Sequence, residues 1–156
     1  MAQVDGGIEI EGLASFRKAL KSISDDLPKM LQKELKEAAE SAAERARVLY
    51  RKNYTRSGGK RGSSGASKHT VDTIRAAATQ TGSSVKFGGV RYPWAAGQEF
   101  GSDRFKQFSP YTGKGPGGRG SWGRAIFPAV RDEREATTAD IQRRFDDLAR
   151  RAYPEI

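Results

Sequence analysis

The sequence predicts an α+β fold, in which an N-terminal helix and a long second helix precede a small antiparallel sheet with extended arms and a C-terminal helix. Two observations lead to this prediction. Apolar residues recur every three or four positions over residues 13–49 and 130–152, as in amphipathic helices. Alternating polar and apolar residues at 6–12 and 84–88 are typical of short strands. At 156 residues the chain fits a single domain spanning 1–156.

The composition indicates acidic partners and little else about chemistry. Lys and Arg number 28 against 19 Asp and Glu, a formal net charge of +9, which favours nucleic acid, an acidic protein surface or an anionic membrane. No cysteine is present, so disulfides and thiolate metal sites are excluded. No apolar run approaches the roughly 20 residues that a transmembrane helix needs, and the first residues lack a signal-peptide pattern. We therefore expect a protein that is made in the cytoplasm and has no membrane partner.

The N-terminal elements follow from the spacing. Residues 6–12 alternate between glycines and predict a strand. Leu13, Phe16, Leu20 and Ile23 then form one face of a helix. The residues Ser24–Asp26 end this helix and offer an N-cap to the next one, which has a proline in its first turn.

A second, long helix is predicted from Leu27 to Lys52. Its apolar stripe changes from leucine to alanine along its length, and consists of Leu27, Leu31, Leu35, Ala38, Ala42, Ala46 and Leu49. The alanines would let another helix approach closely, either within the subunit or in a neighbour. They could equally reflect the high helix propensity of alanine, and the sequence leaves both explanations open.

The end of this helix leads into a basic loop at 53–70. From position 45 to 68 there are eight basic residues and no acid. These candidate contacts to DNA or to a partner are Arg45, Arg47, Arg51, Lys52, Arg56, Lys60, Arg61 and Lys68. Cations complement a helix C-terminus, which could explain Arg51 and Lys52 but not the loop. The loop has too few apolar residues to offset its ordering entropy, so we predict that it is flexible.

The remaining elements are less regular until the C-terminus. Residues 71–78 suit a helix slightly better than a strand, and 84–88 predict a strand. Residues 102–123 are rich in glycine and predict an extended arm. A last helix should run from Phe127 to Ala152. Its expected inward residues are Val130, Ile141, Phe145, Leu148 and Ala152.

No constellation of residues points to catalysis. The single histidine, His69, lies at the edge of the basic loop, and the pairs Asp25–Asp26 and Asp146–Asp147 are explained by helix capping and by a solvated helix face. The segments 58–62 and 113–119 contain Gly and Lys, but neither follows a strand and opens a helix with Gly-Lys-Ser/Thr. We therefore expect no enzyme activity, catalytic residue, metal or cofactor. No sequence-specific nucleic-acid reader is recognisable either.

Four segments carry a resemblance to a known family. Val-Arg-Tyr-Pro-Trp-Ala-Ala-Gly-Gln-Glu-Phe-Gly at 90–101 contains a tyrosine followed by a glutamate–aromatic–glycine triplet. Gly-Leu-Ala-Ser-Phe-Arg-Lys-Ala-Leu at 12–20, the Ala/Arg-rich end of the long helix at 43–49 and Phe-Pro-Ala at 127–129 complete the layout. In these segments the chain resembles the tail-completion or head–tail joining (neck) proteins of long-tailed bacteriophages. It lacks the Thr-Gly-x-Leu that the family usually carries, here replaced at 68–74.

The resemblance implies a structural protein of the virion. Members of that family form rings, usually of six copies, around the DNA channel between the head connector and the tail tube. It implies head connector or stopper proteins and tail-tube or terminator proteins as partners, with non-specific contact to genomic DNA. A tail terminator that caps the tail tube remains an alternative, as does a non-specific basic nucleic-acid-binding protein.

The same resemblance singles out a structural or interface signature. Its residues in this chain are Tyr92, Trp94, Glu99, Phe100 and Gly101. We expect Tyr92 and Phe100 to anchor a turn into the sheet and Gly101 to adopt a backbone geometry that other residues resist. Glu99 should be partly buried, with a basic side chain or backbone N–H groups as its partner.

Overall fold

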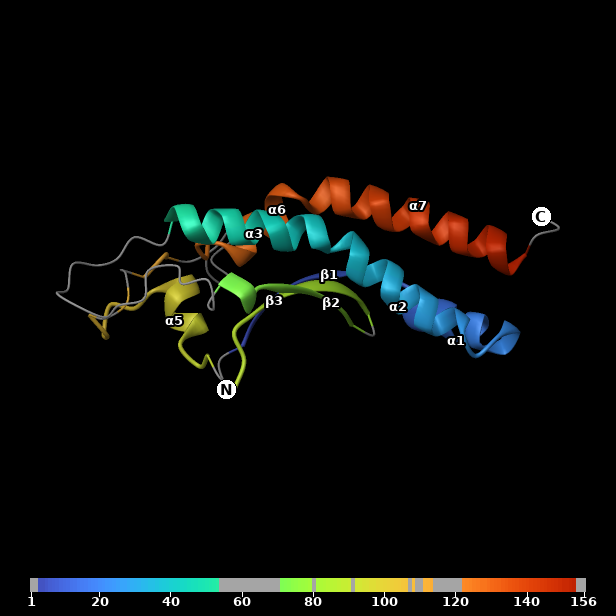
Figure 1. Ribbon diagram of the computed structural model, residues 1–156, viewed down its shortest axis with the longest axis horizontal. Helices are drawn as coiled ribbons and strands as arrows, with labels where there is room; N and C mark the ends of the chain where they lie inside the picture. The colour runs from blue at the N-terminus through green and yellow to red at the C-terminus, as the bar shows by residue number, and fades with distance from the viewer. Residues whose placement is uncertain are drawn as a thin grey trace.

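The computed structural model describes residues 3–53, 71–79, 81–90, 92–106, 108, 111–113 and 122–153. Its class is α+β, as the sequence predicts. The elements in chain order are β1 (Val4–Glu9), α1 (Leu13–Ile23), α2 (Leu27–Ala38), α3 (Glu40–Asn53), β2 (Arg75–Ala78), β3 (Gly82–Phe87), α5 (Ala95–Phe100), α6 (Ile126–Asp132) and α7 (Arg134–Ala152). The molecule is elongated: α2 and α3 follow one another along its length, α7 runs beside them, and α1 and α5 lie near opposite ends (Figure 1). Residues 54–70 of the predicted basic loop and 114–121 of the predicted arm lie outside the described residues.

The sheet has three antiparallel strands in the order β1-β3-β2. In the central row, Val85 of β3 lies opposite Gly6 of β1 on one side and Ala76 of β2 on the other. A Cβ atom at Gly6 would lie 2.8 Å from Ile126 of α6, so the glycine lets α6 approach the sheet closely. The strand expected at 6–12 is thus present, but it begins and ends earlier than the alternation suggests.

The prediction for residues 71–78 is wrong, because only residues 71 and 72 of this segment are helical and Arg75–Ala78 forms the edge strand β2. Ile74 and Ala76 are buried, whereas Arg75 between them is exposed. Pairing with β3 supplies the strand with its hydrogen-bond partners and places Ala76 in the core. This tertiary gain overrides the helix propensity of three consecutive alanines.

The long helix predicted from 27 to 52 is divided at Ala39 into α2 and α3, and the chain changes direction there (Figure 1). The stripe predicted along it is nevertheless the buried face, and the division separates two clusters. We call the first the leucine cluster, formed by Leu13, Leu20, Leu27, Leu31, Leu35, Ala38, Ile141 and Leu148. The second, the alanine cluster, begins at Ala39 and joins α3 to the sheet and to α6. The bend therefore lets α2 pack into the leucine cluster and α3 pack into the alanine cluster.

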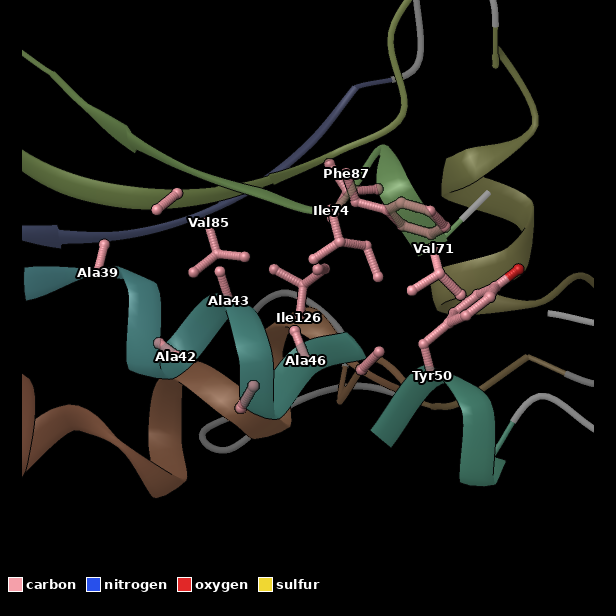
Figure 2. Packing of buried hydrophobic residues seen from close by; sticks show 14 of the residues in the cluster. Ala39, Ala42, Ala43, Ala46, Tyr50, Val71, Ile74, Val85, Phe87 and Ile126 are labelled. Carbon is pink, nitrogen blue, oxygen red and sulfur yellow. The ribbon is translucent and has the colours of Figure 1, made fainter. Parts of the chain in front are cut away.

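The alanines of α3 pack inside the subunit. Ala42, Ala43 and Ala46 are at most 2% exposed and lie in one cluster with Val85 of the sheet and Ile126 of α6 (Figure 2). Small side chains keep the helix backbone close to both neighbours, which favours dispersion contacts over a wide area. Of the two explanations for the alanine stripe, the structure supports close packing within the subunit.

The C-terminal helix is also divided, at Glu133, into α6 and α7. Arg144 of α7 joins this helix to α2: its guanidinium lies 2.5 Å from a carboxylate oxygen of Glu34, 2.9 Å from one of Glu37 and 2.7 Å from one of Asp140. Near this charge cluster, Phe16 stacks on Phe145 with ring centroids 5.4 Å apart. The predicted inward positions Ile141 and Leu148 are buried, and Val130, Phe145 and Ala152 are half-buried.

The capping prediction at the start of α2 is wrong in its detail. Asp26 occupies the N-cap position, but its side chain makes no capping hydrogen bond. Its carboxylate instead accepts a hydrogen bond from Lys29 Nζ at 3.0 Å. Pro28 lies in the first turn as expected, where its missing N–H costs nothing.

Candidate functional site near helix α5

The signature residues lie on and beside the short helix α5 rather than in a turn into the sheet. Tyr92 forms an isolated bridge with Gly89 just after β3, Trp94 is the residue before the helix, and Glu99 and Phe100 form its last turn. Gly101 follows with φ 74° and ψ −173°, a conformation that side chains disfavour, as expected for this position. The helix replaces the predicted turn because Ala95, Gln98 and Glu99 all face inward on successive turns.

Glu99 is completely buried and accepts hydrogen bonds only from backbone groups among the contacts described. Its Oε1 accepts from the N–H groups of Arg124 at 3.1 Å, Ile126 at 2.9 Å and Phe127 at 3.3 Å. Ala125 N–H donates to both oxygens, at 3.2 Å and 3.0 Å. These donors are the unpaired N–H groups at the start of α6, so the carboxylate caps this helix from a distant part of the chain. We call this arrangement the Glu99 latch.

Two opposing effects act on the pKa of Glu99. Burial raises the pKa above its ordinary value of 4.5, and the backbone hydrogen bonds from residues 124–127 lower it, with burial prevailing.

The latch also requires Gly123, which has φ 64° and lies against the carboxylate: a Cβ atom there would overlap Glu99 Oε1. The partner expected for Glu99 is thus present as backbone N–H groups.

Aromatic contacts tie the latch to its surroundings. Phe100 packs against Phe127 of α6 with ring centroids 5.6 Å apart, and both side chains are half-buried. On the other side of α5, Gln98 accepts a hydrogen bond from the buried Tyr50 hydroxyl of α3 at 3.0 Å. The helix is therefore held to both α3 and α6, and the signature fixes the relative position of segments that lie more than 20 residues apart.

The basic positions predicted as contacts do not form one group. Arg47 donates to the Ile74 carbonyl at 2.9 and 3.1 Å and pairs with Glu40 and Glu44, each at 2.9 Å. It supports the start of β2 and is not presented to a partner. Arg45 is exposed but pairs with Asp132 of α6 at 3.3 Å.

Arg51 and Lys52 differ from these two. Both are exposed in the last turn of α3, and neither forms an ion pair with any part of the chain that the structure describes. Arg56, Lys60, Arg61, Lys68 and His69 lie outside the described residues. Of the four predicted contacts that the structure describes, Arg51 and Lys52 are thus the two whose charge is presented to the surroundings.

Sequence reasoning missed the contacts between arginine side chains and aromatic rings in and beside the glycine-rich segment. Arg131 lies over the Trp122 ring, 4.9 Å from its centroid, and Arg104 lies 5.4 Å from the Phe105 centroid. The signal available in the sequence was the repeated occurrence of aromatic residues in a segment too rich in glycine to bury them. Within the described ranges, no cluster of three or more His, Cys, Asp or Glu is arranged to hold a metal ion.

Comparisons with known proteins complete the description. No helix in the described part of the chain has the length and apolar character needed to cross a bilayer. Searches against protein-family models, curated proteins and solved structures found no match to this chain.

Proposed function

We propose that this protein is a structural subunit of a long-tailed bacteriophage neck, of the tail-completion or head–tail joining kind, and that it forms a ring around the DNA channel. The observation that carries the proposal is the Glu99 latch. Within the segment that resembles the neck proteins, Glu99 and Phe100 of the glutamate–aromatic–glycine triplet close α5 onto α6. A motif used in this way maintains a shape, which is the requirement for a subunit that must fit its neighbours.

The state of Glu99 supports a structural role over a chemical one. A general acid must reach a substrate, and the Glu99 side chain is fully buried, with its oxygens surrounded by four backbone N–H groups. We therefore propose that the protein is not an enzyme. We propose that it is located in the virion, after assembly in the host cytoplasm.

The distribution of cations favours an assembly subunit over a free nucleic-acid-binding protein. Arg45 and Arg47 pair with acidic side chains of the same chain, which lowers the charge they offer to phosphates. Arg51 and Lys52 remain presented at one end of α3. The internal pairing of Arg45 and Arg47 supports weak, non-specific contact with passing DNA over tight binding.

Mass measurement and electron microscopy test the proposal. We expect the purified protein to form a closed ring, of six copies if the resemblance holds, and antibodies against it to label the neck of intact particles. A stable monomer that is absent from purified virions would refute it. A ring found capping the tail tube in headless tails would instead favour the tail terminator.

A further inference from the structure

Exposed apolar side chains gather at the end of the molecule formed by α5 and its flanking segments. Eight large hydrophobic residues stand out as exposed in the described part, and five of them lie between positions 90 and 122. We call these five the α5-end patch: Val90, Trp94, Phe105, Tyr111 and Trp122, with exposed fractions from 42% for Trp94 to 78% for Val90. A single exposed apolar residue is ordinary, but a group of this kind marks an interaction surface.

Contacts hold Phe105, Tyr111 and Trp122 near α5, and Val90 and Trp94 lie in the segment that leads into this helix. The Thr112 N–H donates to the Phe100 carbonyl at 2.8 Å, which attaches the segment bearing Tyr111 to α5. The Tyr111 N–H donates to Asp103 Oδ1 at 3.3 Å, two residues before Phe105. Gly113 adjoins the Trp122 ring, since a Cβ atom built there would lie 4.0 Å from it. The patch therefore belongs to the α5 end of the molecule, the end opposite α1 (Figure 1).

Positive charge accompanies the patch. Arg104 and Arg131 lie over the rings of Phe105 and Trp122, and the Arg131 guanidinium also donates to the Trp122 carbonyl at 3.1 Å. Between positions 82 and 131 the sequence contains only two acids, and one of them, Glu99, is buried in the latch. Aromatic residues and arginine are the types enriched at protein interfaces. A basic surface of this kind is complementary to an acidic one.

We infer that the α5-end patch docks onto an acidic protein surface that has an apolar centre. The inference names the chemistry of a partner for the proposed neck subunit and so rests on that function. Nucleic acid suits the patch less well. Arginine side chains cover one face each of Phe105 and Trp122, so each ring has one face fewer on which a base could stack. The most exposed member, Val90, offers nothing to a phosphate backbone.

Intrinsic fluorescence can test this directly, because the two tryptophans of the chain, Trp94 and Trp122, both belong to the patch. The probes are an amphipathic acidic peptide repeating Leu-Glu-Glu-Leu-Leu-Glu-Glu, an all-glutamate peptide of equal length, and single-stranded and duplex DNA of matched charge. We expect the amphipathic peptide to bind most tightly and to shift tryptophan emission to shorter wavelength. High salt should weaken this binding.

A double variant identifies the surface while keeping both reporters. Val90→Ser with Phe105→Ser should weaken binding of the amphipathic peptide about tenfold, since it removes two exposed apolar contacts. Ile23→Ser with Tyr153→Ser, a matched pair of exposed residues on α1 and after α7, should leave the affinity unchanged. Circular dichroism confirms that both variants fold.

The other outcomes overturn either the inference or the proposed function. DNA binding as tightly as the amphipathic peptide would replace the protein partner with nucleic acid. Equal affinity in the two double variants, or no response to any probe, would remove the patch as a docking site. A ring that forms without peptide binding refutes this inference alone, and peptide binding by a protein that forms no ring refutes the proposed function alone.

Discussion

Removing the Glu99 carboxylate should destabilise the fold more than almost any other single change. In Glu99→Ala, four N–H groups at the start of α6 lose their acceptor, and two of them belong to the fully buried residues Ala125 and Ile126. Each buried unsatisfied donor costs about 1–3 kcal/mol. Because the empty volume adds to this, we expect a loss of about 3–5 kcal/mol, a large part of the roughly 5–15 kcal/mol that a domain has.

Glu99→Gln is the matched variant that keeps the shape. Its amide oxygen can replace Oε1, but its NH₂ group then faces the Ala125 N–H that Oε2 accepted at 3.0 Å. One hydrogen bond is lost and two donors oppose each other, so about 1–3 kcal/mol should be lost. Urea unfolding with linear extrapolation measures both variants. If Glu99→Ala unfolds at the same urea concentration as the wild type, the latch is not a stabilising element.

The pH dependence of the same pair provides a second test. Burial raises the pKa of Glu99 in the folded state above the ordinary value of 4.5, so the folded protein binds this proton more tightly than the unfolded chain does. The stabilisation is then complete below pH 4.5 and is lost as the pH rises through the raised pKa. We expect the wild type to gain stability relative to Glu99→Gln as the pH falls, and a difference that stays constant with pH would contradict the shift.

Three further changes probe other parts of the structure. Gly82→Ala should prevent proper pairing of β1 with β3, because the new Cβ would overlap the Ile8 carbonyl oxygen. Gly7→Ala is the control, since its Cβ would lie 3.8 Å from the nearest atom, and thermal melts compare the two variants. Arg47→Ala should lower the free energy of unfolding by about 1–3 kcal/mol, since it leaves the Ile74 carbonyl without this donor. Arg51→Ala should change that free energy by no more than about 0.5 kcal/mol and only reduce retention on heparin. Equal losses of stability in the two variants would refute the different roles of Arg47 and Arg51. Arg144→Met should cost about 1 kcal/mol at low salt and less at high salt. Burial alone would raise the pKa of Asp140, but hydrogen bonds from Arg144 and Arg143 lower it below 3.8. The wild type should lose this stabilisation as the pH falls below 3.8, and urea midpoints in Arg144→Met, which keeps Arg143, should show a smaller decline.

The sequence predicts the parts of the fold whose apolar spacing repeats. The stripe from Leu27 to Ala46 identifies the buried face of α2 and α3 because every third or fourth residue must face the same core. It does not reveal the break at Ala39, since the spacing continues without interruption although the stripe passes there from the leucine cluster to the alanine cluster. The edge strand β2 is missed because its alanines favour a helix locally, and pairing with β3 overrides that preference.

The sequence motif predicts which residues form the candidate site, but it does not predict the contacts that these residues make with distant parts of the chain. That Glu99 is at least partly buried and needs a basic side chain or N–H groups follows from the motif. Its donors lie 25 to 28 positions later in the chain, and no local pattern marks them. Likewise Arg47 looks like any other cation of the basic run. Only the approach of Ile74 from the next element shows that its guanidinium is occupied.

The Glu99 latch also bears on how this protein can change during evolution. The hydrogen bonds to residues 124–127 bring the two ends of the intervening segment together, so the base of that segment is fixed whatever its length. Closing a loop between fixed ends costs only about 0.6 kcal/mol more for each doubling of its length. Changes in the length of that segment should therefore cost little stability, and the patch that it carries can acquire new partners without redesign of the core.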